Sequence, residues 1–204
     1  RQRTHFMSGR MRNGNGKVGI PILYDYSNHD TGLLLISDAN NFQPQLLWRS
    51  GPGKMTAARS NAFAGDFQGN GKTDTAVFYR YTDDDMGLSL LSSDNNFQPQ
   101  SVWRSGPGNW QRQRTRFVTW DDFHFTDNMG IPVFYDYQNN DTGLSIFSKA
   151  TNFQPRQVWR SGPGNWDWNR SYSVGGDFLG SGEMDIAVFY YYSEDVTGLW
   201  LFPS

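Results

Sequence analysis

The stretch Asn41-Phe42-Gln43-Pro44, followed shortly by Trp48-Arg49-Ser50-Gly51-Pro52-Gly53, occurs three times in this chain of 204 residues. It returns at residues 96–99 with 103–108 and at residues 152–155 with 159–164. The tryptophans of successive copies are 55 and 56 residues apart. A period of this length is typical of a supersecondary unit that is repeated around a ring or along a stack.

Two further series follow the same period. A glycine followed by leucine begins a short apolar run at Gly32, Gly87, Gly143 and Gly198. A segment of apolar and tyrosine residues returns at residues 21–26, 76–81, 132–137 and 187–192. With the first series, each complete unit contains four strand-like segments separated by turn-rich segments. Four antiparallel strands in a unit of ~40–60 residues are typical of a β-propeller blade.

We therefore predict an all-β chain, a β-propeller of four four-stranded blades of ~55 residues, with the last blade lacking one strand. Residues 1–204 are expected to form a single repeat domain, with units at approximately 1–53, 54–108, 109–164 and 165–204. A larger ring, and a homo-oligomer in which two chains complete one ring, stay open as alternatives.

Composition narrows the functional classes. The chain contains 8 Trp, 10 Tyr and 15 Phe, which favours strands. Its net charge of −2 provides no basic face for nucleic acid. No segment reaches the ~20 apolar residues that a membrane-spanning helix needs. The absence of cysteine excludes disulfides and thiol catalysis.

The segment Gly65-Asp66-Phe67-Gln68-Gly69-Asn70-Gly71-Lys72-Thr73-Asp74, with the apolar run that follows it, resembles the FG-GAP/VCBS repeat. Residues 176–189 are similar to a second copy. Such repeats occur in secreted actinobacterial proteins, fungal propeller lectins and the integrin α-subunit head. The resemblance implies propeller blades and a secreted, extracellular binding protein.

In that family the loop binds Ca²⁺. The resemblance implies the ligands Asp66, Gln68, Asn70 and Asp74, with the backbone carbonyl of Lys72. The neutral Gln68 stands where the family has a carboxylate, which lowers the ligand charge. The loops of the other units lack more of the ligands: Leu179 occupies one ligand position, and the loops near residues 11–19 and 122–130 depart further. The alternative is a set of turns closed by Asx hydrogen bonds.

Repeated Trp-Arg pairs are the candidate ligand-binding residues. An indole face stacks on a pyranose, and a guanidinium donates paired hydrogen bonds to hydroxyls. The pairs are followed by two tryptophans that we expect to be exposed stacking platforms. The set is Trp48, Arg49, Trp103, Arg104, Trp110, Trp159, Arg160 and Trp166. A tryptophan at one position of every unit is more commonly core between blades, which is the alternative.

Acidic turns at residues 28–30, 83–85, 139–141 and 194–195 are expected to be solvated hairpin tips. No Gly-x-Ser-x-Gly motif or histidine pair at metal spacing occurs, so we predict no enzyme activity. The expected function is a non-catalytic, multivalent, lectin-like carbohydrate-binding module, stabilised by Ca²⁺, whose partners are glycans or glycoproteins. A protein-interaction or adhesion module is the alternative, and a glycoside hydrolase is the least favoured.

Overall fold

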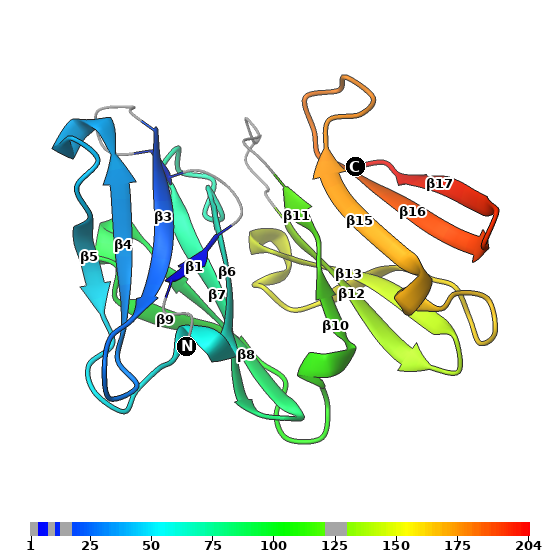
Figure 1. Ribbon diagram of the computed structural model, residues 1–204, viewed down its shortest axis with the longest axis horizontal. Helices are drawn as coiled ribbons and strands as arrows, with labels where there is room; N and C mark the ends of the chain where they lie inside the picture. Colours follow the sequence, from blue (N-terminus) through cyan, green and yellow to red (C-terminus); the bar gives the residue numbers. More distant parts are fainter. Residues whose placement is uncertain (1–3, 8–10, 13–17, 121–129) are drawn as a thin grey trace. The chain divides into compact units, whose positions relative to one another are not determined.

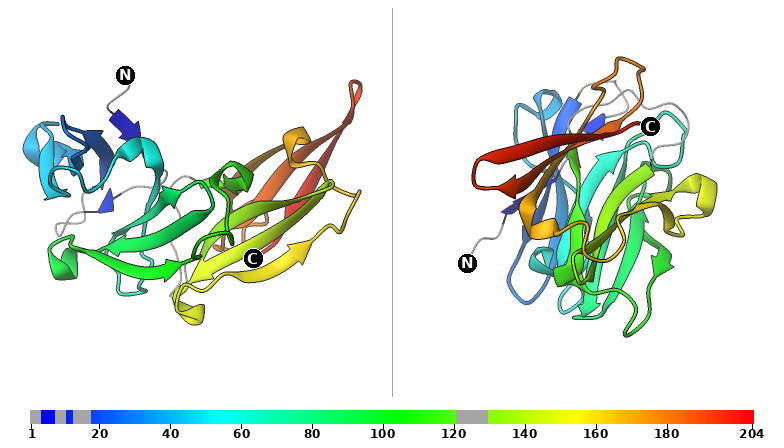
Figure 2. Two further views of the ribbon diagram at one scale, coloured as in Figure 1. Left: turned by 90° about the horizontal axis from the view of Figure 1, so that it is seen from below. Right: turned by 90° about the vertical axis from the view of Figure 1, so that its right-hand side faces the viewer.

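The computed structural model describes residues 4–7, 11–12, 18–120 and 130–204. The chain divides into two compact units, unit 1 over residues 1–110 and unit 2 over residues 111–204. Figures 1 and 2 show that each unit is built from strands, joined by turns and single-turn 3-10 helices. In the described residues no helix is both long enough and apolar enough to pass through a lipid bilayer.

Unit 1 contains two antiparallel sheets. In the first sheet β1 and β2 both pair with β3, which continues to β4 and β5. The second sheet has the order β6-β7-β8-β9. The strands are β1 (Thr4–Phe6), β2 (Met11–Arg12), β3 (Val18–Asp25), β4 (Thr31–Ser37), β5 (Gln45–Arg49), β6 (Ser60–Gly65), β7 (Asp74–Thr82), β8 (Asp85–Leu91) and β9 (Pro99–Arg104).

Unit 2 contains the other two sheets. The third sheet has the order β10-β12-β13-β14, and the fourth has the order β11-β15-β16-β17. The strands are β10 (Thr115–Phe117), β11 (Thr119–Trp120), β12 (Gly130–Gln138), β13 (Asp141–Ser148), β14 (Arg156–Arg160), β15 (Ser171–Gly176), β16 (Asp185–Ser193) and β17 (Val196–Phe202). The fourth sheet has three strands of its own, since β11 comes from the preceding repeat.

The fold class predicted from the repeats is confirmed: the chain is all-β and consists of four β-propeller blades, the last with three strands of its own. The chain changes sheets at Val118, which is fully buried. β10 pairs antiparallel with β12, whereas β11 pairs parallel with β15.

The turn between the second and third strand of the third blade is short. In the third blade β12 and β13 are joined by Asn139 and Asn140 alone, both with positive φ, at 53° and 54°. Two left-handed residues in a two-residue loop match the right-handed twist of a hairpin, and asparagine tolerates that conformation better than most residues. The two strands therefore continue to the tip of the hairpin, with β12 ending at Gln138 and β13 beginning at Asp141.

The repeated glycine is explained by a repeated tyrosine. A Cβ atom on Gly87 would lie 2.8 Å from Cε2 of Tyr81, and the other three blades show the same overlap. The equivalent pairs are Gly32 with Tyr26, Gly143 with Tyr137, and Gly198 with Tyr192. Two of the sequence series are thus the two sides of one packing contact, in which the ring lies against bare backbone.

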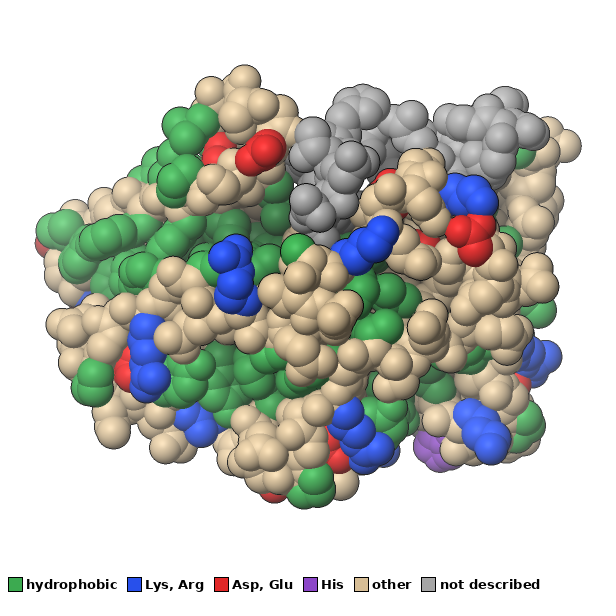
Figure 3. All heavy atoms as spheres, turned by 180° about the vertical axis from the view of Figure 1, so that it is seen from behind, with side chains coloured by type: hydrophobic (Ala, Val, Ile, Leu, Met, Phe, Trp, Pro, Cys, Tyr) green, Lys and Arg blue, Asp and Glu red, His purple; other side chains and the backbone are tan. Residues whose placement is uncertain are grey.

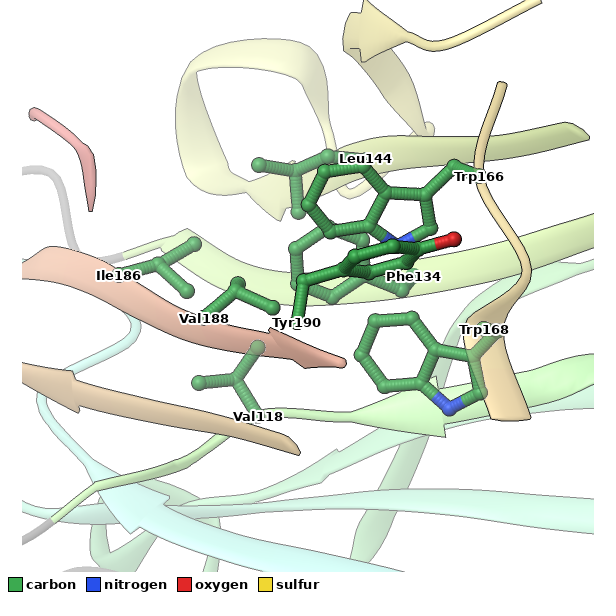
Figure 4. Packing of buried hydrophobic residues seen from close by; sticks show 8 residues of the cluster. All are labelled: Val118, Phe134, Leu144, Trp166, Trp168, Ile186, Val188 and Tyr190. Atoms are coloured by element: carbon green, nitrogen blue, oxygen red, sulfur yellow. The ribbon is translucent and has the colours of Figure 1, made fainter. Parts of the chain in front are cut away.

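Each unit has its own hydrophobic core. In unit 1 the buried residues include Leu23, Leu33 and Val77. In unit 2 the centre is aromatic: Phe134 lies with its ring centroid 4.6 Å from that of Trp168, and Trp166 lies 4.4 Å from Tyr190 (Figure 4). Both tryptophans come from the segment that enters β15, so this segment connects the third and fourth blades.

The fourth blade exposes apolar side chains that the other blades bury. Leu199 is 63% exposed, whereas its counterparts Leu33, Leu88 and Leu144 are at most 2% exposed. In those blades the leucine is opposite the tryptophan of an outer strand, as in the pair Leu88 and Trp103. In the described residues β17 has no such strand beside it. Hydrophobic side chains accordingly gather on the left of Figure 3, where unit 2 lies.

Candidate binding site

The arginine of each Trp-Arg pair belongs to a cluster of three side chains that recurs in three blades. The guanidinium lies over a tyrosine ring and forms an ion pair with an aspartate that begins the third strand or directly precedes it. The members of these Arg–Asp–Tyr clusters are Arg49, Asp30 and Tyr26; Arg104, Asp85 and Tyr81; and Arg160, Asp141 and Tyr137.

The geometry of the cluster is nearly the same each time. In the second blade Nη2 of Arg104 donates to Oδ2 of Asp85 at 2.7 Å, and its Cζ lies 4.0 Å from the centroid of Tyr81. The Ser105 hydroxyl also donates to this carboxylate. In the first blade Asp30 Oδ1 also accepts a hydrogen bond from the backbone amide of Gly51 at 2.9 Å. The aspartate therefore holds the Ser-Gly-Pro-Gly turn onto the sheet.

This arrangement corrects the expectation for three of the acidic turns. The turns were predicted to be solvated tips, but their third residues, Asp30, Asp85 and Asp141, are only 1–2% exposed. A carboxylate is stable at such a depth because it is paired and hydrogen-bonded. A signal was present in the sequence. The aspartate recurs in the three blades whose Trp-Arg pair lies in this sequence, whereas the fourth blade has Val196 at this position.

The cluster makes stability depend on pH. Hydrogen bonding from Arg104 holds the pKa of Asp85 below its usual range. A lowered pKa stabilises the fold above the unfolded-state value of about 4, and this contribution is lost as pH falls through the folded-state value. We expect Asp85→Asn to lower the free energy of unfolding by about 1–3 kcal/mol at pH 7, because a buried charged hydrogen bond is lost.

Urea unfolding at pH 7 and pH 3 checks this prediction. The difference between wild type and Asp85→Asn should shrink at pH 3. Asp195→Asn changes an exposed carboxylate in the corresponding turn of the fourth blade, and should stay within about 0.5 kcal/mol of wild type at both pH values. A difference for Asp85→Asn that is the same at both pH values would contradict the ion pair.

The predicted binding tryptophans lie at different depths. Trp48 and Trp103 are 9% and 8% exposed, and Trp159 is half-buried. Trp110 is half-buried with its ring edge-on to Trp103, at a centroid distance of 5.6 Å. Trp166 is only 3% exposed. The prediction that Trp166 is an exposed platform is therefore wrong, because its ring packs into the aromatic core of unit 2 (Figure 4).

A cavity of about 340 Å³ lies in unit 1 between the first and second blades, and we call it the aromatic cavity. Trp48 and Arg49 line it from the first blade, and Tyr79 and Tyr81 line it from the second. Of the predicted binding residues, the cavity therefore contains one complete Trp-Arg pair. Its remaining lining residues are Ser50, Lys54, Met55, Val77, Ser89, Leu91, Gln98 and Pro99.

The corresponding positions of unit 2 are occupied by larger aromatic side chains. Trp166 stands in the repeat where unit 1 has Met55, and Trp200 stands where unit 1 has Ser89. The rings of Trp166 and Trp200 are 5.4 Å apart, and Trp166 also packs on Trp159 at 5.3 Å. The cavity in unit 1 therefore lies where two repeat positions carry smaller side chains than the tryptophans of unit 2.

A second cavity, of about 440 Å³, adjoins the aromatic cavity in unit 1, and we call it the basic cavity. Its lining includes Arg59 and Arg80, and Met55 and Tyr79 line both cavities. The other lining residues are His29, Gly53, Thr56 and Ala58. None of the described residues that line either cavity is an aspartate or glutamate.

The predicted calcium loop is closed by hydrogen bonds of its own. The Asp66 carboxylate accepts from the amides of Asn70 and Gly71, and the Gln68 amide donates to Asp74 Oδ1 at 3.1 Å. Asp74 is fully buried, and its Oδ2 has no hydrogen-bond partner of normal geometry among the described residues. Lys72 forms an ion pair with Asp94.

Burial raises the pKa of Asp74; Ser92 and Gln68 oppose the shift, and the Asp66 carboxylate adds to it. Two neighbouring carboxylates and a buried oxygen without a partner suit a hard cation such as Ca²⁺. In the part of the chain that the structure describes, no three His, Cys, Asp or Glu residues gather as a metal centre. Calcium here would depend on amide and backbone oxygens for its other ligands.

The related loop in the fourth blade is satisfied without a cation. Oδ2 of Asp185 accepts from the amides of Phe178 and Leu179, each at 3.0 Å, and Oδ1 accepts from Ser204. Asp177 accepts from the amides of Ser181 and Gly182. The two loops therefore differ in how their buried aspartates are hydrogen-bonded. The loop near residues 122–130 of the third repeat lies largely outside the described residues.

Comparison with known proteins does not assign this chain to a family. No protein-family model matches this chain, and no curated protein has a significant sequence match to it.

Proposed function

We propose that this protein is a non-catalytic carbohydrate-binding module of lectin type that acts on glycans or glycoproteins outside the cell. The observation that carries the proposal is the aromatic cavity of unit 1. Tyr79, Tyr81 and Trp48 line the cavity and supply aromatic surface for the apolar face of a sugar. Lys54, Ser50 and Gln98 supply polar groups for hydroxyls.

The size of the cavity favours a ligand of about one sugar ring, since small-molecule sites begin near 300 Å³. A monosaccharide has about twelve non-hydrogen atoms, and ~0.3 kcal/mol per atom corresponds to a dissociation constant of about millimolar. Useful affinity then requires several sites acting together. Trp103 with Arg104 and Trp159 with Arg160 remain predictions for such further sites.

The absence of acidic lining residues favours binding without catalysis. Glycoside hydrolysis ordinarily needs two carboxyl groups on either side of the scissile bond. The described residues that line the two cavities include no carboxylate. We therefore do not propose a hydrolase.

Titration with neutral monosaccharides, followed by tryptophan fluorescence and calorimetry, tests the proposal. Saturable binding should weaken several-fold in Gln98→Ala, which removes a polar lining residue. Gln154→Ala is the matched control, because Gln154 is the exposed repeat counterpart of Gln98 in unit 2. If no sugar binds, or if both variants bind as wild type does, the proposed site is wrong.

We further propose that the blades are FG-GAP-like and that Ca²⁺ binds the Asp66 loop. Calcium at 100 times its dissociation constant would stabilise the fold by ~2.7 kcal/mol, which raises Tm by about 5–10 °C in a chain of this size. Differential scanning calorimetry with Ca²⁺ and with EDTA measures this. Asp66→Asn should abolish the response, whereas Asp177→Asn, at the equivalent position of the fourth blade, should retain it. A wild-type Tm that is the same with Ca²⁺ and with EDTA would contradict a calcium site at the Asp66 loop.

A protein-interaction module is the second candidate, favoured by the apolar fourth blade. Leu199 is 63% exposed, Val196 52% and Trp200 44%, and contiguous apolar surface of this kind is typical of protein contacts. The partner would supply a β-strand that pairs with β17 and covers Leu199 with an aromatic side chain, as Trp103 covers Leu88. Leu199→Lys should abolish binding to such a partner and leave sugar binding unchanged.

A further inference from the structure

The sheet of the fourth blade turns one apolar face to solvent. Of the sixteen large hydrophobic side chains that are exposed in the described residues, ten belong to residues 171–204. Val188 and Tyr190 of β16 pack into the core of unit 2. Because side chains alternate along a strand, Phe189 and Tyr191 point to the opposite face of the sheet.

Strand pairing extends this surface across the sheet that β15, β16 and β17 form in Figure 1. Phe189 is opposite Tyr172 of β15 and Leu199 of β17. Leu201 follows two residues after Leu199 and therefore lies on the same face. We call this surface the outer face of the fourth blade. Its five large side chains are each 38–66% exposed: Tyr172, Phe189, Tyr191, Leu199 and Leu201.

The outer face carries no charge. The smaller side chains between its large ones come from Val174, Ala187 and Thr197. The strand β17 contains no charged residue over its whole length, and among the described strands it pairs with β16 alone. Proteins usually protect such an edge with charged side chains, and a contiguous exposed apolar patch is typical of a contact site. The occupant of this face is therefore expected to be apolar and uncharged as well.

The same positions of the third blade show what kind of surface covers such a face. Phe134 is the repeat counterpart of Phe189. Leu144 is the counterpart of Leu199, and both Phe134 and Leu144 belong to the core that the third blade shares with β16. Their face is thus covered by the apolar face of another sheet, which is the usual way in which sheets stack. The outer face of the fourth blade fits a second apolar sheet face.

We propose that this chain forms a symmetric dimer in which the outer faces of two fourth blades pack on each other. A two-fold contact uses the same surface of both copies, and an uncharged face meets its own copy without like-charge repulsion. The exposed parts of the five large side chains amount to roughly 500 Å² per copy. Stable complexes bury about 800 Å² per partner, so we expect the dimer to dissociate at about 1–100 μM. The inference goes beyond the proposed function and does not depend on sugar binding.

Sedimentation velocity over about 1–100 μM tests the inference. The mass of wild type should rise from 23.3 kDa toward twice this value. Phe189→Lys places a charge on the middle strand of the outer face and should stay monomeric. Leu46→Lys is the matched control, because Leu46 is an exposed leucine of unit 1, and this variant should dimerise as wild type does. Thermal melts establish that both variants are folded.

The symmetry of the contact gives a second readout. Phe189 lies between Tyr172 and Leu199, near the centre of the outer face, so it meets its own counterpart close to the two-fold axis. An equimolar mixture of Phe189→Lys and Phe189→Glu, each monomeric alone, should therefore form a dimer.

Four outcomes would overturn the inference. Wild type could remain monomeric at the highest concentration, or Phe189→Lys could dimerise as wild type does. The mixture of the two charged variants could fail to associate. Finally, loss of the dimer in Leu46→Lys would indicate a contact that uses unit 1 and is not symmetric about the outer face. None of these outcomes bears on sugar titrations, so the proposed function is tested separately.

Discussion

Met55→Trp is expected to abolish saccharide binding, with a loss of at least 100-fold, while the protein stays folded. The substitution places at residue 55 the side chain that the other repeats carry, Trp110 and Trp166. In unit 2 the indole of Trp166 is 97% buried against Trp159, Tyr190 and Trp200, so the repeat accommodates it. In unit 1 the same indole would fill the aromatic cavity.

Calorimetric sugar titration and thermal unfolding measure the two halves of this prediction. The Tm should be equal to or above that of wild type, because filling a cavity adds packing contacts. Met55→Leu is the control: it keeps the volume of the side chain and should keep binding within a few-fold. Full binding by Met55→Trp would show that sugars bind elsewhere, and a large fall in Tm would show that the two units pack differently at this position.

Phe134→Ala is expected to lower the free energy of unfolding by about 3–5 kcal/mol, the usual cost of removing a large aromatic side chain from a core. Phe134 is fully buried, and its ring contacts Trp168 at 4.6 Å and Phe202 at 5.9 Å. Its loss would leave a hole beneath both rings. Urea unfolding followed by tryptophan fluorescence measures the change.

Phe189→Ala is the matched control for this experiment. Phe189 occupies the same repeat position in the fourth blade but is 43% exposed, so its removal should cost less than about 1 kcal/mol. Similar losses in the two variants would mean that Phe189 is covered in solution, for example by a partner on the fourth blade. A small loss for Phe134→Ala would contradict the core of unit 2.

The fold could be predicted from the sequence because the same residue types recur at the same positions of each repeat. Glycine, tyrosine and tryptophan recur at fixed spacing, and each proved to hold a fixed packing position, as in the contact of Gly87 with Tyr81. The depth of individual side chains was harder to predict. Trp166 follows a glycine-rich turn, which indicated a loop, yet tertiary packing on Tyr190 buries it. Turn chemistry reports the path of the backbone and does not report what its side chains contact.

The candidate site could be predicted only in part, for a related reason. Trp48 and Arg49 were identified as repeated residues, but the cavity depends on the positions where the repeat is broken. Met55 stands where the second and third repeats have Trp110 and Trp166, Arg80 stands where the others have Asp25, Asp136 and Tyr191, and Ser89 stands where the fourth blade has Trp200. These smaller or charged side chains form a cavity only where two neighbouring blades face each other, and the sequence of a single repeat does not show this. A comparison of the repeats for departures, rather than for likeness, is the signal that would have found them.

The Arg–Asp–Tyr cluster holds the Ser-Gly-Pro-Gly turn in place, whereas other residues determine which ligand fits the cavity. It holds the Ser-Gly-Pro-Gly turn by contacts that do not involve residue 55, and it is the same whether that position carries methionine or tryptophan. Residue 55 and its neighbours on the adjacent blade are therefore free to change without loss of the frame. A chain of such units can acquire, alter or close a pocket by one or two substitutions, so relatives with the same blades should differ widely in what they bind.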